Sequence, residues 1–329
     1  MSDKRRASNG GQGALVKRQR HDRSSTLKAP VWRLTGHKDA LWCCRFDPTG
    51  TLLATAGVDR SILIWNIQDG LNTTHVPALK GIVTDMQWSR DSTCIFAAAA
   101  STLKTYDLET GTSIRTFRGH EDVVNSVSVN KKGREMLGSC SDDGSVMLWD
   151  PRHKRPVSKY DSQYPVIAVE LDAYRPLIYS AGVESGIRVR DLRTGNVLYE
   201  LSGHKEPVSS LRLSADSSML LSASVDSMVK LWDTRPAVPV ESRFMKQLEG
   251  AKLSMNCCPI RGSFSFNNRL VGLGSEDGTA VIWDCTSGRL AEKLPGHRGV
   301  VHDVEFSPTE MVLATCSEDK CALVSEVRG

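Results

Sequence analysis

The sequence predicts an all-β chain in which seven similar sheets form a closed ring, and three observations predict it. First, seven similar segments follow one another at intervals of 41, 43, 41, 42, 51 and 41 residues. Second, a Gly-His pair recurs at positions 36–37, 119–120, 203–204 and 296–297. Third, each repeat reads as four short strands separated by turns, without a long stretch of helical periodicity. The residues at the centres of the segment ends are Trp65, Tyr106, Trp149, Arg190, Trp232, Trp283 and Val324.

The first repeat shows how each strand is recognised. Residues 41–46 (LWCCRF) precede the turn 47–50 (DPTG), and residues 52–56 (LLATA) and 61–65 (SILIW) flank a second turn at 58–60. Apolar, β-branched runs bounded by Pro, Gly and Asp are typical of strands. A period of about 40–45 residues with Gly-His and Trp-Asp markers is the signature of WD repeats. The chain is therefore predicted to be a seven-bladed WD40 β-propeller.

The sequence also predicts how the ring closes. The last repeat ends near Val327, one strand short of a complete blade. Residues 31–36 (VWRLTG) resemble the outer-strand segments 197–203 (VLYELSG) and 290–296 (LAEKLPG). We therefore expect the N-terminal strand to complete the last blade, which removes a free sheet edge.

Three repeats carry the same four polar or aromatic residue types at equivalent positions. WD repeats place at these positions a hydrogen-bond chain from Trp through Ser or Thr and His to Asp, which satisfies groups that burial would otherwise leave unpaired. A catalytic triad is needed only once, so three copies favour a structural role, and we expect no catalytic residue. The three sets are His37, Thr55, Asp59 and Trp65; His120, Ser139, Asp143 and Trp149; and His204, Ser222, Asp226 and Trp232.

The other repeats are incomplete. The second has Ala100 where the Asp belongs, and the fourth lacks the Gly-His pair and has Arg190 in place of Trp. The sixth keeps Asp277 and Trp283 without the Gly-His pair, while the last keeps His297 but lacks the Trp. Imperfect blades are tolerable because each packs between neighbours that share its core.

Charge divides the chain into two expected regions. Residues 1–29 carry eight Lys or Arg and two Asp, a net charge of +6, which leaves −2 for the remainder of a chain whose total is +4. The segment is rich in Gly, Ser and Asn and has no aromatic residue, so it cannot bury enough apolar surface to offset its ordering entropy. We expect a disordered basic arm at 1–29 and the propeller at 30–329.

The arm contains two basic clusters that resemble a bipartite nuclear import signal. Basic stretches of this kind also bind RNA phosphates or acidic proteins non-specifically, and a solvated tail without a partner is the third possibility. Any RNA contact is expected to go through this arm, because the body is slightly acidic. The candidate import residues are Lys4, Arg5, Arg6, Lys17, Arg18 and Arg20.

Several function classes lack support in the sequence. The nine cysteines form no CxxC pair, and the pair Cys316 and Cys321 falls across an expected hairpin, so we expect free buried thiols and no metal. No phosphate-binding Gly loop is present, and we expect neither a cofactor nor an enzyme activity. No run of 18 apolar residues could span a membrane, and no apolar stretch follows the basic N-terminus as in a secretory signal.

Binding is expected on the propeller's narrower face. Residues that start each inner strand, and those just before each turn Asp, line this face by repeat alignment. Trp42 is an aromatic there, and aromatics are frequent interface anchors, although the neighbouring core also needs them. Loops at 235–250 and 261–269 are additional candidates. The candidate protein-binding residues are Trp42, Asn125, His302, Asp142, Glu276 and Glu318.

Segments outside the generic repeat pattern carry a resemblance to one family. These are VKRQRH (16–21), AGVDRSILIWN (56–66), WDTRPAVP (232–239) and KLPGHRGVVHDVEFSP (293–308) with CSEDK (316–320). Together they resemble the 40 kDa WD-repeat proteins of the spliceosomal U5 small nuclear ribonucleoprotein, over nearly the whole chain. The resemblance implies a monomeric nuclear scaffold in pre-mRNA splicing. Its implied partners are the large central splicing protein, on which it would dock, and the neighbouring U5 GTPase and helicase.

A second function remains open from the residues alone. Trp149-Asp150-Pro151-Arg152 and Trp232-Asp233-Thr234-Arg235 fit the WDxR pattern of substrate receptors of cullin-4 ubiquitin ligases. The pattern is short, and an Arg beside a strand-end Asp usually forms a local ion pair. Ligase docking is therefore the alternative hypothesis to a splicing scaffold.

Overall fold

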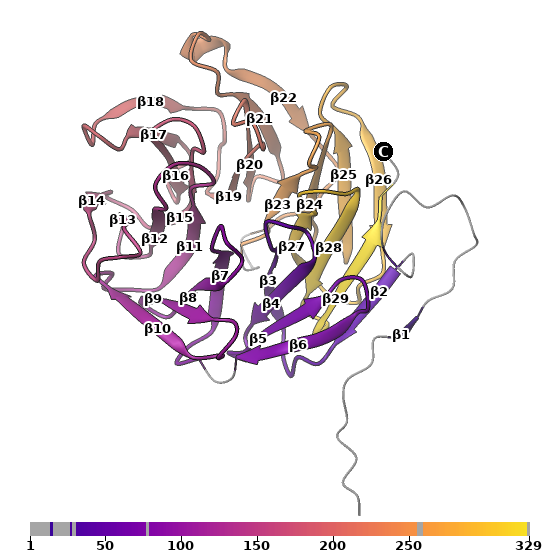
Figure 1. Cartoon of the computed structure of the whole chain (residues 1–329). Helices are drawn as coiled ribbons and strands as arrows, with labels where there is room; N and C mark the ends of the chain where they lie inside the picture. The colour runs from indigo at the N-terminus through magenta and orange to yellow at the C-terminus, as the bar shows by residue number, and fades with distance from the viewer. Residues whose placement is uncertain (1–13, 16–26, 28–30, 77–78, 255–258, 328–329) are drawn as a thin grey trace, which may run out of the picture.

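The fold is a seven-bladed β-propeller, as the repeats predict (Figure 1). The computed structural model describes residues 14–15, 27, 31–76, 79–254 and 259–327. Apart from one short 3-10 helix, η1 (Val240–Ser242), the regular elements of this part are strands. No helix in the described ranges is long and apolar enough to cross a membrane.

Six blades are four-stranded antiparallel sheets whose strands follow each other in sequence from the central channel outward. The first three blades contain β3 (Leu41–Phe46), β4 (Leu52–Gly57), β5 (Ile62–Asn66) and β6 (Leu71–Val76); β7 (Val83–Trp88), β8 (Cys94–Ala99), β9 (Thr102–Asp107) and β10 (Ser113–Arg118); and β11 (Val124–Val129), β12 (Leu137–Ser141), β13 (Ser145–Trp149) and β14 (Ser158–Asp161). The next three contain β15 (Val166–Leu171), β16 (Leu177–Gly182), β17 (Ile187–Asp191) and β18 (Val197–Leu201); β19 (Val208–Leu213), β20 (Met219–Ser224), β21 (Val229–Asp233) and β22 (Phe244–Leu248); and β23 (Gly262–Phe264), β24 (Leu270–Gly274), β25 (Thr279–Asp284) and β26 (Leu290–Pro295).

The seventh blade combines both ends of the described chain. Its strands β27 (Val301–Phe306), β28 (Val312–Ser317) and β29 (Cys321–Glu326) are completed by β2 (Val31–Thr35), which pairs antiparallel with β29 from Val31↔Ser325 to Thr35↔Cys321. The predicted closure by the N-terminal strand is confirmed. A further two-residue strand, β1 (Ala14–Leu15), pairs with β2 and makes this sheet five-stranded.

Burial explains why the inner strands read as continuous apolar runs. Each blade is covered on both faces by its neighbours, so strands such as β16 and β28 are buried at every position. The outer strands are covered less, and β18 and β26 expose most of their residues. The hydrophobic effect, at about 25 cal/mol per Å² of apolar area, therefore acts mainly between blades. Leu27, within the segment expected to form the arm, is 3% exposed and belongs to the core cluster of the first and last blades.

The longest repeat interval has a local cause. Residues 234–243, between β21 and β22, form an extended connection that contains η1 and reaches outward from the ring (Figure 1). Arg243 ties this connection back, because its Nη1 donates to the carbonyl oxygen of Asp233 at 2.9 Å. The insertion lengthens one connection without changing the number of strands in the blade.

Ring closure generates the first prediction. A chain that begins at Gly36 lacks β2 and Leu27. The edge of β29 is then exposed, as are the apolar residues that Trp32 and Leu34 cover in the full chain. We expect its thermal unfolding midpoint to fall by more than 10 °C, since several buried side chains at about 2–5 kcal/mol each are lost. Differential scanning calorimetry measures this. A chain that lacks only residues 1–13 is the control and should melt like the full chain; equal midpoints for all three chains would contradict closure by β2.

Candidate protein-interaction face around the central channel

The four residues of the first predicted set meet inside blade one. Trp65 Nε1 donates to Thr55 Oγ1 at 2.8 Å, and the Thr55 hydroxyl lies 2.8 Å from His37 Nε2. On the other side of the imidazole ring, His37 Nδ1 lies 2.7 Å from Asp59 Oδ2. Since the Trp N–H occupies the hydroxyl oxygen and the carboxylate can only accept, the chain requires an imidazole that accepts at Nε2 and donates at Nδ1.

The other sets have the same geometry. His120 Nε2 lies 2.7 Å from Ser139 Oγ, and His204 Nε2 lies 2.7 Å from Ser222 Oγ. Their Nδ1 atoms lie 3.1 Å from Asp143 and 3.1 Å from Asp226, and Trp149 and Trp232 donate to the two serines at 2.8 Å. Without a Trp, blade seven keeps His297 between Thr315 and Asp319. In every set both ring nitrogens are occupied within the blade.

Burial favours the neutral imidazole in two of these sets, those of His120 and His204. Burial lowers the pKa of His120 and of His204, and the nearby Asp143 and Asp226 offset this only in part. Burial would raise the pKa of Asp143, but hydrogen bonds from Ser145 and from the Glu121 N–H hold it at about 2. The result is a neutral histidine beside an ionised aspartate, which is the protonation state that the hydrogen-bond chain needs.

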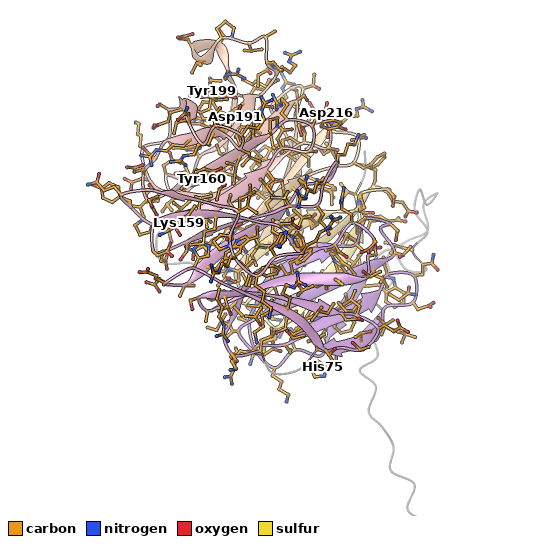
Figure 2. All side chains as sticks on the ribbon, turned by 60° about the vertical axis from the view of Figure 1, so that its left-hand side comes forward. His75, Lys159, Tyr160, Asp191, Tyr199 and Asp216 are labelled. Carbon is orange, nitrogen blue, oxygen red and sulfur yellow. The ribbon has the colours of Figure 1, made fainter. Side chains whose placement is uncertain are left out.

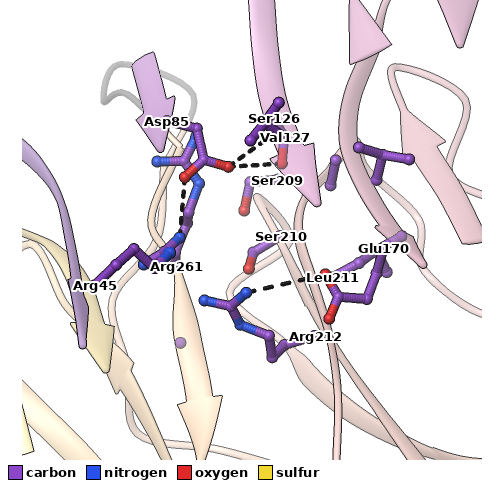
Figure 3. A pocket seen from close by; sticks show the side chains of 13 residues that line it. Arg45, Asp85, Ser126, Val127, Glu170, Ser209, Ser210, Leu211, Arg212 and Arg261 are labelled. Carbon is purple, nitrogen blue, oxygen red and sulfur yellow. Dashed lines mark hydrogen bonds and ion pairs between the residues drawn. The ribbon is translucent and has the colours of Figure 1, made fainter. Parts of the chain in front are cut away.

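The central channel contains a buried ionic network at the level of the inner strands (Figure 3). Arg45 of β3 is ion-paired with Asp303 of β27 and, at 3.1 Å, with Asp85 of β7. Asp85 also accepts from Ser126 Oγ at 2.9 Å and from the Val127 N–H at 3.0 Å on β11. One carboxylate thus joins blades one, two and three across the channel.

A second part of the ionic network joins blades four, five and seven. Arg212 of β19 is paired with Glu305 of β27 at 2.7 Å and lies 3.9 Å from Glu170 of β15. Burial raises the pKa of Glu170 above its usual value despite the Arg212 charge. For Asp85, burial acts in the same direction, but Arg261 and Arg45 outweigh it and lower the pKa. The network fixes the relative position of the inner strands, which line the channel.

At one end of the channel the inner strands surround a cavity of about 500 Å³, including its open mouth. Trp42 and Asn125 line it, as do Thr84, Val123, Pro259 and Arg261. Arg261 spans the opening, since its Nη2 donates to the carbonyl oxygen of Asn125 at 2.9 Å and its Nη1 to that of Trp42 at 3.4 Å. The cavity therefore combines an aromatic wall, an amide and a guanidinium, the groups with which proteins hold a partner's side chain.

The six candidate residues do not all lie in this cavity. His302 lies beside Trp42, with their ring centroids 6.5 Å apart, but it is only 4% exposed. Burial and Arg261 lower the pKa of His302 to about 4, so it is a neutral residue beneath the opening. Asp142 is exposed and accepts from Asn125 Nδ2 at 2.7 Å.

Glu276 and Glu318 lie on the turns after β24 and β28, outside the cavity lining. Glu318 is exposed, whereas Glu276 is half-buried and its Oε1 has no hydrogen-bond partner within the described residues. These two carboxylates extend the same end of the propeller toward blades six and seven. The structure thus brings Trp42, Asn125, His302 and Asp142 together and leaves Glu276 and Glu318 at the rim.

Sequence reasoning missed Arg261 as a site residue. It stands directly before β23, a strand of only three residues in the repeat with the longest interval, so repeat alignment gave it no clear position. The strand register places Arg261 level with Asp85 and Asp303, two charged residues of the channel network, and spacing in the sequence does not reveal this register. In the same loop, Phe264 is buried in the core and Phe266 is 41% exposed.

The two WDxR arginines differ in their contacts. Arg235 is held by Asp233, with its Nε 3.0 Å from both carboxylate oxygens. In the other motif, Asp150 pairs with Arg134, and only the backbone N–H of Arg152 donates to it, at 2.9 Å. The motif at residues 232–235 therefore forms the local ion pair that its spacing suggests. The predicted import residues of the arm lie outside the described residues.

The sequence is similar to those of several known proteins. The family model described as "WD domain, G-beta repeat" matches residues 28–66, 111–150, 195–233 and 288–324. "Pre-mRNA-splicing factor cwf17" of Schizosaccharomyces pombe is 35% identical over 93% of this chain and 90% of its own length. The "U5 small nuclear ribonucleoprotein 40 kDa protein" of Homo sapiens is 36% identical over 93% of this chain and 86% of its own, and that of Dictyostelium discoideum is 34% identical over 93% and 87%.

The chain belongs to the U5 small nuclear ribonucleoprotein 40 kDa protein family. The family resemblance drawn from the sequence is thus confirmed. The similarity to these relatives covers 93% of the chain, whereas the WD repeat model leaves most of blades two, four and six unmatched.

The hydrogen-bond chains inside the blades generate a prediction about the stability of the fold. Ser139→Ala removes the acceptor of Trp149 Nε1 and the donor to His120 Nε2, and leaves both groups buried and unpaired. We expect a loss of about 1–3 kcal/mol in the free energy of unfolding, measured by urea denaturation. Ser113→Ala, at an exposed position of β10, is the matched control and should change it by less than about 0.5 kcal/mol. Equal effects of the two changes would contradict the structural role.

The neutral histidines generate a pH prediction. His120, His204 and His302 have lowered pKa values in the fold, so between pH 6.5 and 5 the unfolded chain binds more protons at these positions than the folded one. Each such histidine should therefore lower the free energy of unfolding with decreasing pH, by up to about 1.4 kcal/mol per pH unit, whereas the raised pKa of Glu170 acts in the opposite direction. The lowered pKa of Asp143 acts only below its usual value of 3.8, outside this window.

Denaturant titrations at several pH values measure the slope. His302→Gln should make the slope shallower, because its uncharged amide binds no proton in either state. The control is His75→Gln, at an exposed position on the outer strand β6 (Figure 2), which should leave the slope unchanged. Equal slopes for the unaltered chain and for His302→Gln between pH 6.5 and 5 would contradict the prediction.

Proposed function

We propose that this protein is a non-enzymatic scaffold of the spliceosome, a U5 small nuclear ribonucleoprotein component that acts in pre-mRNA splicing in the nucleus. The observation that carries the proposal is similarity over 93% of the chain to relatives whose names state a splicing factor and a U5 40 kDa protein. These relatives are covered over 86–90% of their own length, so the likeness is not that of one shared module.

A scaffold role without catalysis agrees with the chemistry of the blades. The His, Ser or Thr, and Asp residues that could form a nucleophile and base are hydrogen-bonded to one another and to Trp inside the sheets. Among the described residues, no group of three or more His, Cys, Asp or Glu side chains could hold a metal ion. What remains for function is the surface of a rigid ring.

The end of the channel that Trp42 and Arg261 line is the proposed docking surface for the large central splicing protein, beside the U5 GTPase and helicase. It offers an aromatic side chain, an amide and a guanidinium around one cavity, on strands that the ionic network holds in place. Interface anchors are typically aromatic or Arg residues in such desolvated pockets. The basic arm at 1–29 is proposed to carry the nuclear import signal and any RNA contact.

The docking surface can be tested with Trp42→Ala. The protein is tagged and recovered from nuclear extract, and the co-purified U5 RNA and splicing proteins are quantified. We expect their recovery to fall at least about tenfold, as for an interface anchor, with an unchanged unfolding midpoint. Tyr174→Ala is the matched control, because Tyr174 is 54% exposed in the β15–β16 connection at the opposite end of the blades.

Full recovery with Trp42→Ala would exclude this cavity as the docking surface. Absence of U5 RNA and splicing proteins from the unaltered chain would overturn the proposed function itself. Recovery of ubiquitin-ligase subunits alone would favour the alternative of a cullin-4 substrate receptor.

A further inference from the structure

Blade four contains a pocket where other blades contain a histidine. His37 and His120 stand four residues before the first residue of their inner strands, and Ser162 occupies that position before Val166. The side chain at this position is therefore a hydroxymethyl group instead of an imidazole. A small pocket of about 10 Å³, room for about one water-sized group, lies here and is lined by Ser162 and Tyr164 before β15 and by Ser180 and other residues of β15–β17.

The position of the tryptophan is also changed. Trp149 stands ten residues after its serine partner, and Arg190 stands ten residues after Ser180, to which its Nη1 donates at 3.2 Å. Arg190 is 7% exposed and lines the pocket. A guanidinium with five N–H donors therefore replaces an indole with one.

Arg190 lacks a counter-charge in the part of the chain that the structure describes. No carboxylate oxygen there lies within 4.0 Å of its nitrogens, and the hydrogen bond to Ser180 is its single one. The neighbouring Arg188 is different, because it is ion-paired with Glu184 and donates to Ser162 Oγ at 2.8 Å. Burial and the charge of Arg188 lower the pKa of Arg190, although the nearby Tyr160 and Glu184 act in the opposite direction.

Other contacts of Arg190 do not supply the missing charge. Its guanidinium lies 5.8 Å from the ring centroid of Tyr160, whose hydroxyl is buried without a hydrogen-bond partner within the described residues. Tyr160 belongs to β14 of the adjacent blade and is visible on the outer side of the ring (Figure 2). Buried charges in proteins are normally paired, so this site is incomplete without an anion.

The surroundings of the pocket decide which anion fits. Tyr164, which lines the pocket, is 44% exposed, and Val183, next to the lining residue Glu184, is 43% exposed. These exposed apolar groups suit contact with a partner's apolar side chains. Glu184 also lines the pocket but is ion-paired with Arg188, so the pocket offers a single cation, Arg190, without a carboxylate of the described residues within 4.0 Å, which does not favour a polyanion such as RNA. A single carboxylate matches the one unpaired guanidinium in charge and in its planar, two-pronged geometry.

The pocket is continuous with the docking surface proposed above. Asn125 lines the cavity at the channel mouth, and its Nδ2 donates at 3.0 Å to the carbonyl oxygen of Val166, which lines the pocket of blade four. One extended segment of a partner can therefore contact both sites. This step rests on the proposed scaffold function, whereas the chemistry of the pocket does not.

We propose that the pocket between Ser162, Ser180 and Arg190 binds the carboxylate of a Glu or Asp side chain presented by a protein partner. The vacated histidine position gives the space, and the buried guanidinium gives the charge. The carboxylate would accept from Arg190 and from the hydroxyl groups of Ser162 and Ser180.

Binding is tested on the full chain by NMR of the arginine Nε–Hε resonances. The probes are N-acetyl-glutamate amide, its glutamine analogue, inorganic phosphate and a short single-stranded RNA. We expect the Arg190 resonance to shift saturably with the glutamate probe, and the glutamine analogue to bind about tenfold more weakly or not at all. No shift with the glutamate probe, or equal affinity for the glutamine analogue, would overturn the proposal. Tighter binding of phosphate or RNA would also overturn the assignment to a protein carboxylate.

Two variants separate the pocket from the fold. Ser162→His refills the vacated position and should abolish the shift while Arg190 remains as the reporter. Arg190→Gln removes the charge and should abolish binding by calorimetry. Arg193→Gln, at an exposed arginine in the turn that follows β17, is the matched control and should bind normally. Binding that survives both pocket variants would place the site elsewhere and overturn the proposal.

Recovery from nuclear extract distinguishes this inference from the proposed function. Ser162→His should reduce the recovery of splicing proteins as it reduces probe binding; full recovery would overturn the assignment of the carboxylate to that assembly. If the unaltered chain recovers no splicing proteins but still binds the glutamate probe, the proposed function fails and the carboxylate site stands.

Discussion

The ladder between β2 and β29 is the constraint on which the rest of the molecule depends. Each blade buries both faces against its neighbours, so a blade without a neighbour would expose apolar strands on one side. The five paired residues of β2 complete the seventh blade and leave no gap in the ring. The channel network, the mouth cavity and the pocket of blade four all require the inner strands to stay at fixed distances, and only a closed ring provides this.

Within that frame, the same backbone carries two kinds of polar interior. Where a blade has His, Ser or Thr, Asp and Trp, these four side chains are hydrogen-bonded to one another within the blade, and the arrangement contributes to stability. Where blade four has Ser162 and Arg190 at those positions, the partner set is incomplete. Blade four thus has a polar interior that differs chemically from that of the blades with the full residue set, and such a difference is what would let a partner distinguish one blade from another.

The fold could be predicted from the sequence because spacing alone carries it. Trp65, Trp149 and Trp232 mark every second blade at intervals of 84 and 83 residues, and residues 31–36 repeat the outer-strand pattern closely enough to predict closure. The site was less accessible. Trp42 and Asn125 could be placed at the channel mouth by alignment, but the burial of His302 and the reach of Arg261 across the opening depend on side-chain packing between blades. Repeat spacing contains no information about such contacts.

Closure by β2 also bears on how the chain is made. Its partner β29 lies nearly three hundred residues further along, so β2 leaves the ribosome long before β29 and cannot complete the seventh blade until β29 has been made. Blades one to six contain only strands that are close in sequence and can form in order during translation. The seventh blade is therefore the last of the seven to assemble, and Trp32 and Leu34 of β2 gain their buried surroundings only at that step.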